Sequence, residues 1–384
     1  MTGVLDRITE TLERRGLTLT ASHPRGQGWL ILQIVDVDGT PVAGQWFADP
    51  ELASVVAAQT EARGSVPVPV LDRDVLVQRE GVDRRLPALH RLVASPGATL
   101  VTHRAERRGV VRRSERDGAA TYTKVLRPSR TAATVGRARL AVDGVAMPRV
   151  TASDVRVGTV TCEELPGARL HDVLADPAVS SHRLGSVARA VGEALARLHR
   201  TAPPDDLGTH DASAELEVTE TWLDHAATYG LLDAALTDSG PTLRAHLERL
   251  RTFAAEPGCG PTLIHRDLHD KQVVVGDGDA VGMLDFDLAT TGEAALDLAN
   301  LLVHLELRAL QGLCPADTSR TCAESLVDGY APDPGVWRRV PGYMLAAQLR
   351  LAAVYAFRPG SAWLGPLLLA RATPGPLRQQ EVFA

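Results

Sequence analysis

The sequence predicts an α+β fold with antiparallel strands in its first 165 residues and a mainly helical remainder. Up to residue 165, short apolar runs alternate with turn signals such as Asp38-Gly39, which is typical of hairpins. From residue 166 onward, apolar residues recur at three- and four-residue steps, as in HRLGSVARAVGEALARLHR at 182–200, which indicates helices. One short β-like stretch, within 263–287, interrupts the helical half.

The first part of the chain, residues 1–95, is expected to be a small α+β unit without catalytic motifs. Residues 1–16 carry acids and bases between apolar positions, as an amphipathic helix does. The apolar runs on either side of Asp38-Gly39 predict a hairpin, and residues 51–64 predict a second helix.

Residues 96–165 and 166–384 are expected to form the second and third parts of the chain. Three strand-like runs between residues 98 and 127 predict an antiparallel meander. A short helix is predicted at 129–142, and a further strand ends at Pro166-Gly167, where a linker would lead into the helical part.

Composition and charge exclude several classes of function. The net charge is −6 and only residues 104–116 form a basic stretch, so we expect no nucleic-acid partner. No apolar stretch reaches the ~20 residues that cross a bilayer, and the amphipathic N-terminus does not resemble a secretion signal. We therefore expect a cytoplasmic protein without a membrane partner. The four cysteines match no zinc pattern and suit a reducing compartment, and no sequence signal indicates an oligomeric state.

Lysine is rare in this chain, which has only Lys124 and Lys271 and uses arginine elsewhere, as expected of a GC-rich genome. Under such a bias exposed lysines would drift to arginine. The two that remain are therefore candidates for functional roles.

The stretch LIHRDLHDKQVVVGDGDAVGMLDFD at 263–287 combines a hairpin with a row of polar side chains. Strands at 272–275 and 281–284, joined by GDGDA, would bring Asp267 and Gln272 close to Asp285. Carboxylate and carboxamide oxygens are ligands that suit Mg²⁺, which usually also keeps contacts to substrate phosphates.

The spacing within this stretch is more informative than any single acid, because loop acids are often solvated or cap helices. His-x-Asp is followed five residues after the Asp by Gln272, and thirteen residues later by Asp285-Phe286-Asp287. Phosphoryl transfer needs a carboxylate that accepts a hydroxyl proton, together with a carboxamide and a second carboxylate that hold metal.

LIHRDLHDKQVVV followed by GMLDFDLATTGEAALDLANLL resembles the catalytic core of the aminoglycoside phosphotransferase and choline kinase-like small-molecule kinases. A protein kinase would show Asp-Phe-Gly and later Ala-Pro-Glu, which this chain lacks. CEELPGARLHDVL is similar to the linker between the lobes of that family. The resemblance covers about residues 96–357 and implies a bilobal protein-kinase-like fold. Residues 1–95 are similar in placement to the N-terminal cap of maltokinase-like and glucosamine-kinase-like enzymes.

The resemblance assigns roles residue by residue and implies ATP and Mg²⁺ as cofactors. Asp267 would be the catalytic base and His265 would brace its loop, while Asp297 would anchor that loop. Gln272 and Asp285 would bind Mg²⁺. A second set would contact the nucleotide: Lys124, Arg104, Arg107, and Glu164 in the linker.

The chain departs from the family pattern at three places. Gln272 stands where asparagine is expected, and its extra methylene requires the metal or its loop to shift. The turn HRAERRG contains a single glycine, so Arg104, Arg107 or Arg108 would have to compensate with charge, or the turn is merely solvated. The helix after Lys124 has no glutamate to pair with it. The partner of that lysine would then be the nucleotide alone, Asp143, or an acid of residues 1–95.

Lys271 follows the expected base closely and would either neutralise the transferred phosphoryl group or point to solvent. The implied function is phosphorylation of a hydroxyl on a small polar metabolite such as a sugar, an amino sugar or an aminoglycoside. Two alternatives stay open, a kinase that modifies Ser or Thr of a peptide and a pseudokinase that only binds nucleotide. Acids that would suit a cationic acceptor lie between residues 205 and 224: Asp205, Asp206, Asp211, Glu215, Glu217, Glu220 and Asp224.

Overall fold

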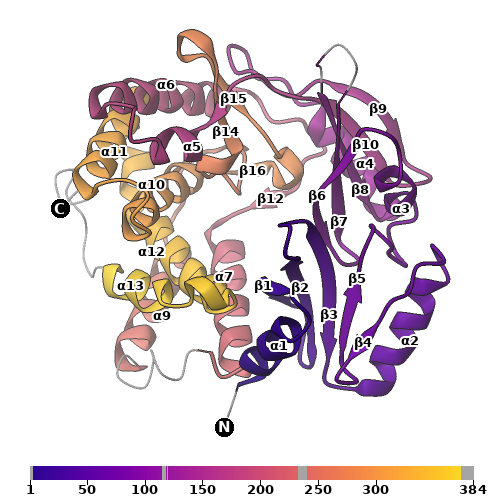
Figure 1. Cartoon of the computed structure of the whole chain (residues 1–384). Coiled ribbons are helices and arrows are strands. Elements are labelled where there is room, and N and C mark those ends of the chain that lie inside the picture. Colours follow the sequence, from indigo (N-terminus) through magenta and orange to yellow (C-terminus); the bar gives the residue numbers. More distant parts are fainter. Residues whose placement is uncertain (1–2, 115–117, 119, 232–239, 373–384) are drawn as a thin grey trace.

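The computed structural model describes residues 3–114, 118, 120–231 and 240–372. Parts of the expected first unit, of the basic stretch 104–116, of the segment 205–257 and of the C-terminal part therefore lie outside the described residues. Figure 1 shows the strands of the first half gathered on one side of the molecule and the helices of the second half on the other.

The first five strands form an antiparallel sheet in the order β1-β2-β3-β5-β4. They are β1 (Thr18–Pro24), β2 (Trp29–Val35), β3 (Pro41–Phe47), β4 (Val70–Leu71) and β5 (Val75–Gln78). The predicted hairpin is β2 and β3, and its turn places Gly39 at φ +76°, where glycine has no steric cost. We call residues 3–95 the N-terminal unit.

Alternating side chains bury both faces of this first sheet. Leu30 and Leu32 pack with α1 (Val4–Glu13), whose apolar residues lie on one helical stripe. Phe47 and Leu76 pack on the other face with α2 (Pro50–Glu61). The amphipathic pattern of the first 16 residues is thus explained by packing on the sheet.

The second sheet has the order β6-β7-β8-β10-β9. Its strands are β6 (Ala98–Arg104), β7 (Arg108–Ser114), β8 (Ala120–Leu126), β9 (Val150–Asp154) and β10 (Thr159–Glu163). The predicted meander is β6, β7 and β8, followed by α4 (Pro128–Ala138). Strand β9 is absent from the sequence prediction because four of its five residues are exposed, so it lacks the alternation that marks a half-buried strand. Leu89 of α3 (Leu89–Val93) packs against this sheet.

The second half of the chain is a helical bundle with two three-stranded sheets, β11-β14-β15 and β12-β16-β13. Its helices are α5 (Leu170–Ala175), α6 (Ser181–Arg200), α7 (Ala212–Thr228), α9 (Gly240–Ala255), α10 (Ala294–Leu310), α11 (Ala316–Tyr330), α12 (Pro334–Ala356) and α13 (Leu364–Arg371). Its strands are β11 (Ala168–Arg169), β12 (Thr209–His210), β13 (Pro261–Ile264), β14 (Val273–Val275), β15 (Val281–Met283) and β16 (Thr290–Glu293). Helix α10 is buried along most of its length and forms the centre of the core.

The N-terminal unit contacts the helical half as well as the second sheet. Its core includes Leu223 from α7 and Phe357 just after α12. The N–H of Ser22 on β1 donates to the carbonyl of Phe357 at 2.8 Å, and the N–H of Trp29 donates to the hydroxyl of Tyr229 at 3.2 Å. The first unit therefore bridges the strand-rich and helical parts, which its sequence does not indicate.

None of the helices in the described part of the chain is long and apolar enough to span a membrane. All four cysteines are free thiols. The expected boundaries between parts of the chain, at residues 95 and 165, stay predictions. Helix α3, which precedes residue 95, shares a core with the second sheet.

Candidate active site

The carboxylate of Asp297, at the start of α10, anchors the loop after β13. It accepts the backbone N–H of His265 at 2.6 Å and of Arg266 at 2.7 Å. The ring of His199 also contacts it at 3.2 Å. Arg266 adopts a left-handed φ of +72°, a strained conformation that these bonds compensate. The expected anchoring contact of Asp297 is therefore present.

His265 connects the loop to the end of β15. Its Nε2 lies 2.8 Å from the carbonyl oxygen of Leu284, and its ring stacks obliquely on Phe286 with centroids 4.6 Å apart. The side chain is fully buried. This position is the one that bracing of the loop requires.

Gln272 ends a short 3₁₀ turn, Asp270–Gln272, and its carbonyl accepts the N–H of Leu284 at 2.8 Å. The predicted hairpin is present as β14 and β15, with Gln272 just before the first strand. Its side-chain Oε1 is buried and has no hydrogen-bond partner among the described residues. A buried carboxamide oxygen without a donor is costly unless a ligand satisfies it, and a hard cation is such a ligand.

Asp285 and Asp287 meet Lys124 and Arg108 of the second sheet. The Lys124 ammonium lies 2.6 Å from Asp285 Oδ1 and 2.7 Å from Asp287 Oδ1. Arg108 Nη1 lies 3.2 Å from Asp285 Oδ2. Asp285 has a left-handed backbone, with φ 63° and ψ 52°, which turns the chain sharply after β15.

The two carboxylates around the Lys124 ammonium have pKa values that are shifted in opposite directions. Burial alone would raise the pKa of Asp285, but Lys124 and Arg108 outweigh it and hold that pKa well below its usual range. Burial and the neighbouring Asp285 raise the pKa of Asp287. Burial alone would lower the pKa of Lys124, but the two carboxylates outweigh it and raise that pKa, so the lysine stays charged at neutral pH.

Of the partners considered for Lys124, neither Asp143 nor an acid of the N-terminal unit is the one found. Asp143 is exposed, and no acid of the N-terminal unit contacts the lysine in the described part of the chain. Asp285 and Asp287 fill that place instead. The signal was present in the sequence, because the second aspartate of Asp-Phe-Asp replaces the glycine of other kinases.

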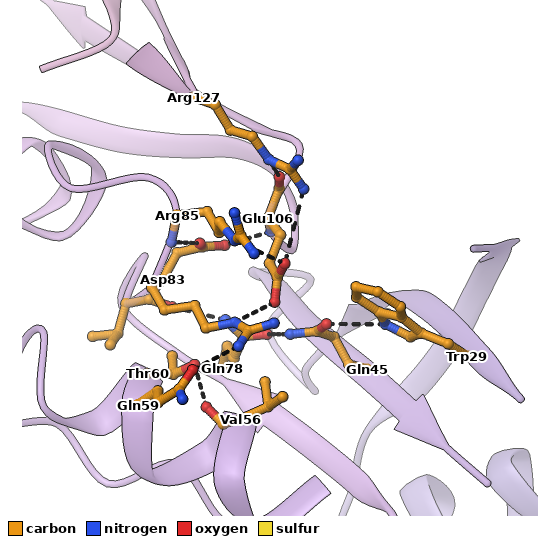
Figure 2. A network of polar contacts seen from close by, with 12 residues as sticks. Trp29, Gln45, Val56, Gln59, Thr60, Gln78, Asp83, Arg85, Glu106 and Arg127 are labelled. Atoms are coloured by element: carbon orange, nitrogen blue, oxygen red, sulfur yellow. Dashed lines mark hydrogen bonds and ion pairs between the residues drawn. The ribbon is translucent and has the colours of Figure 1, made fainter. Parts of the chain in front are cut away.

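The turn between β6 and β7 is fixed by a buried acid, Glu106, whose φ is +59°. Its carboxylate lies 2.6 Å from Arg84 Nε, 3.6 Å from Arg85 Nε and 3.8 Å from Arg127 Nη2. The N–H of Glu106 donates to Asp83 at 2.7 Å. Figure 2 shows how this network ties the turn to the first sheet.

Arg104 and Arg107 belong to the same turn but have neither an ion pair nor a side-chain hydrogen bond within the described ranges. Burial, followed by the neighbouring charges of Arg108 and Arg358, lowers the pKa of Arg104 to about 10. Burial and then Arg25 act in the same way on Arg107, whose pKa is also about 10. Both guanidinium groups are therefore available for an anion.

The remaining predicted site residues occupy different surroundings. Asp267 is half-buried and acts electrostatically on Arg104, without a hydrogen-bond partner in the described structure. Lys271 is exposed to solvent. The carboxylate of Glu164 is exposed and accepts from the hydroxyl of Tyr122 at 2.9 Å and from Arg112. Its expected contact with nucleotide stays a prediction.

Three of the acids between residues 205 and 224 have structural partners. Glu215 is buried against His210 at 2.9 Å and Arg350 at 3.3 Å. Asp211 caps α7, and Glu220 pairs with Arg251 at 2.7 Å. These three acids are thus occupied by structural contacts.

No group of three or more His, Cys, Asp or Glu side chains that could hold a metal is found among the described residues. Magnesium often takes only one or two carboxylates and completes its shell with phosphates and water. The oxygen-rich set of Gln272, Asp285 and Asp287, with its unsatisfied carboxamide, fits such a site.

Comparisons with known proteins agree with this geometry. Residues 93–343 match the model of the phosphotransferase enzyme family, and the chain belongs to that family. This match confirms the expectation of a phosphotransferase. A comparison with curated protein sequences gave no significant match.

The first of three similar solved structures confirms the predicted bilobal fold. Amicoumacin kinase hAmiN, solved with AMP-PNP, Ca²⁺ and Ami, is 12% identical over 72% of this chain and 88% of its own, with a TM-score of 0.51. The macrolide 2'-phosphotransferase MphH from Brachybacterium faecium is 20% identical over 77% of this chain and 100% of its own, with a TM-score of 0.43. A glucosamine kinase is 18% identical over 94% and 92%, with a TM-score of 0.43.

Proposed function

We propose that this member of the phosphotransferase enzyme family transfers the terminal phosphoryl group of ATP to a hydroxyl of a small polar metabolite, with Mg²⁺ as cofactor. One observation carries the proposal. Lys124 from the second sheet meets Asp285 and Asp287 at the end of β15, beside the unsatisfied oxygen of Gln272. A cation for phosphates and oxygens for a metal are thus in one place.

In this proposal each residue has one task. Asp267 accepts the proton of the acceptor hydroxyl while the hydroxyl oxygen forms a bond to the γ-phosphorus. The bond between that phosphorus and the leaving oxygen of ADP breaks. His265 holds the loop through Leu284. Lys124 and Arg108 orient the phosphates, and Arg107 is a further candidate for them.

Gln272 and Asp285 would hold Mg²⁺, with Asp287 close by. Bound magnesium supplies charge neutralisation for the phosphates. Lys124 would exchange one of its two carboxylate partners, Asp285 or Asp287, for a phosphate of the nucleotide. Lys271, which is exposed and adjacent to the loop, would approach the transferred group only with substrate in place.

The contacts of the N-terminal unit favour a small acceptor over a peptide. That unit bonds to the segment after α12 through Ser22 and Phe357, and it also fixes the turn between β6 and β7 through Glu106. Both parts that border the site are therefore tied to a third one, which restricts the opening that an extended peptide needs. Sugars and amino sugars are the acceptor classes that we would test first.

The experiment that tests the proposal is ADP release with mass detection of products across sugars, amino sugars, aminoglycosides and peptides. The wild type should give a phosphorylated product, and Asp267→Asn should lower kcat by about 10²–10⁴-fold, the usual contribution of a positioned base. Equal product from both proteins would remove Asp267 from the mechanism. No product from the wild type with any acceptor would overturn the phosphotransferase proposal.

Nucleotide and metal binding are tested separately by thermal unfolding. ATP with Mg²⁺ should raise Tm more than ATP with EDTA, and Asp285→Ala should abolish the difference, because the metal loses a ligand. Stabilisation by ATP that is indifferent to both EDTA and the substitution would instead support a pseudokinase.

A further inference from the structure

Four positively charged side chains near the Asp267 loop and the end of α12 lie close enough to influence one another. Arg358 follows α12, Arg104 ends β6, Lys271 follows Asp267 by four residues, and Arg308 lies on α10. Charge interactions connect them, since Arg358 acts on both Arg104 and Lys271, Arg308 acts on Lys271, and Asp267 acts on Arg104. Arg104 also pairs in register with Arg108, which contacts Asp285, so it lies between this group and the cations of the second sheet.

Backbone contacts of the N-terminal unit fix this arrangement. The N–H of Ser22 donates to the carbonyl of Phe357 at 2.8 Å, so β1 runs beside Arg358. Ala105, next to Arg104, packs against Ile31 of β2, and Ile31 pairs in register with His23 of β1. The first sheet thus draws Arg104 and Arg358 toward the same place.

The cations of this group differ in whether an acid compensates them. Arg308 is neutralised by Asp270, with two hydrogen bonds of 2.7 and 2.6 Å. Arg104 has no carboxylate within ion-pair distance, and Arg358 only stacks on Tyr355 at 4.5 Å, as far as the described residues show. Both are half-buried, so their mutual repulsion is weakly screened.

Neutral histidines surround these arginines and do not add to the charge. Burial, followed by the charge of Arg104, lowers the pKa of His23 to about 4. Burial, followed by His269 and Arg308, lowers the pKa of His304 well below its usual value. At neutral pH the local charge is therefore that of the arginines and Lys271. Like charges that lie close together with no carboxylate within ion-pair distance, as Arg104 and Arg358 do in the described structure, are suited to bind an anion.

We propose that Arg104 and Arg358 bind an anionic group, a phosphate or a carboxylate, on the acceptor that Asp267 deprotonates. The inference rests on the proposed function and narrows its acceptor to acidic or phosphorylated sugars and amino sugars. It moves Arg104 from the donor, where the sequence placed it, to the acceptor. The donor keeps cationic partners of its own in Lys124 and Arg108.

The first test compares matched acceptors that differ only in charge: glucose, glucuronate and glucose 6-phosphate, and glucosamine with glucosamine 6-phosphate. The acidic member of each set should have a kcat/KM at least about tenfold higher, as expected for one charge-assisted bidentate contact. Glucuronate and glucose 6-phosphate separate the two sources of negative charge. Equal or better use of the neutral or cationic members overturns the inference.

The second test uses Arg358→Gln, with Arg338→Gln on the exposed face of α12 as a matched control. Arg358→Gln should raise the KM of the acidic acceptor about tenfold and leave the KM of ATP unchanged, whereas Arg338→Gln should change neither. Arg358→Lys should restore part of the preference, which a merely structural role would not predict. A raised KM for ATP alone would assign Arg358 to the donor.

A binding measurement separates this inference from the proposed function. Inorganic phosphate is titrated into the full chain saturated with AMP-PNP and Mg²⁺, so that the donor phosphates occupy their own site. Phosphate should raise Tm of the wild type and of Arg338→Gln but not of Arg358→Gln. No shift in the wild type overturns the anion site. If phosphate raises Tm but the protein phosphorylates no acceptor, the anion site is supported and the proposed reaction is rejected.

Discussion

Glu106 and Arg108 lie two residues apart in the turn between β6 and β7, yet their charged surroundings differ. The Glu106 side chain is 1% exposed and is held by arginines of the N-terminal unit and of the segment after β8. Arg108 is 29% exposed and faces Asp285 and Asp287, which are 22% and 19% exposed. One turn therefore separates a buried charge network from a partly solvated one.

The difference separates charges that maintain the fold from charges that, in the proposed function, would contact a ligand. Three arginines lie within ion-pair distance of the Glu106 carboxylate, although its Oε2 has no hydrogen-bond partner among the described residues, and the network connects the turn to the first sheet (Figure 2). In the candidate site, by contrast, the carboxylates of Asp285 and Asp287 both contact Lys124, and the side-chain oxygen of Gln272 has no hydrogen-bond partner in the described structure. Packing would not select such an arrangement, whereas binding of phosphates and metal would.

The largest expected effect is on catalysis, in the solvated network. Asp285→Asn should lower kcat by about 10³-fold, because it removes a proposed metal ligand and leaves Lys124 with one acid. Its free energy of unfolding should change by less than about 1 kcal/mol, since the pair is partly solvated. Steady-state kinetics and urea unfolding measure the two quantities. If Asp285→Asn instead lost much of its stability but kept a normal kcat in the folded form, Asp285 would belong with the charges that maintain the fold.

The ion pair between Arg339 and Glu293 is a second buried charge contact that can be compared with the candidate site. Arg339 donates to Glu293 at 2.7 and 3.0 Å, and Tyr343 donates at 3.0 Å. Glu293→Gln should cost about 3 kcal/mol of the free energy of unfolding, because Arg339 would remain buried without its charge partner. Urea unfolding at pH 7 measures this cost, and a value below about 1 kcal/mol would contradict it.

The same pair predicts a dependence of stability on pH. Burial alone would raise the pKa of Glu293, but hydrogen bonds from Arg339 and from the N–H of Cys259 outweigh it and lower that pKa. A lowered pKa in the folded protein stabilises above the unfolded value of about 4.3, and that contribution is lost as pH falls through the folded value. The stability difference between wild type and Glu293→Gln should therefore shrink below about pH 4. A difference that grows with acidity would reject this assignment.

Glu106→Gln tests the network beneath the turn directly. We expect a loss of about 2 kcal/mol in the free energy of unfolding, less than for Glu293, because Arg85 and Arg127 can reach solvent. The KM of ATP should rise severalfold as the turn loosens, while kcat stays within about threefold. Glu61→Gln, at the exposed end of α2, is the matched control. Unchanged stability in Glu106→Gln would show that the network is dispensable.

The smallest effect is expected for Lys271. Its side chain is exposed, so Lys271→Ala should change the free energy of unfolding by less than about 0.5 kcal/mol. If it neutralises the transferred phosphoryl group, kcat should fall about tenfold or less. A loss as large as that of Asp285→Asn would place Lys271 among the essential residues, and no loss would leave it as a solvated lysine.

The sequence predicted the fold class and most of the elements because local patterns carry that information. Hydrophobic periodicity predicted α1, α2 and α6, and turn chemistry predicted the hairpins around Gly39 and before Asp285. Spacing also brought His265, Gln272 and Asp285 together, since paired strands fix which residues face one another. These features depend on residues that are close in the chain.

The charge partners were decided only by the tertiary structure. Lys124 is 161 residues from Asp285, and Glu106 is 21 residues from Arg127 and 22 from Arg84. No local pattern specifies which acid such a cation finds, because the choice depends on how separate sheets and helices pack. The bridging contact between Ser22 and Phe357, 335 residues apart along the chain, has the same origin. The sequence thus determined the elements and the candidate catalytic motif, and packing decided which charges are buried and which stay partly exposed.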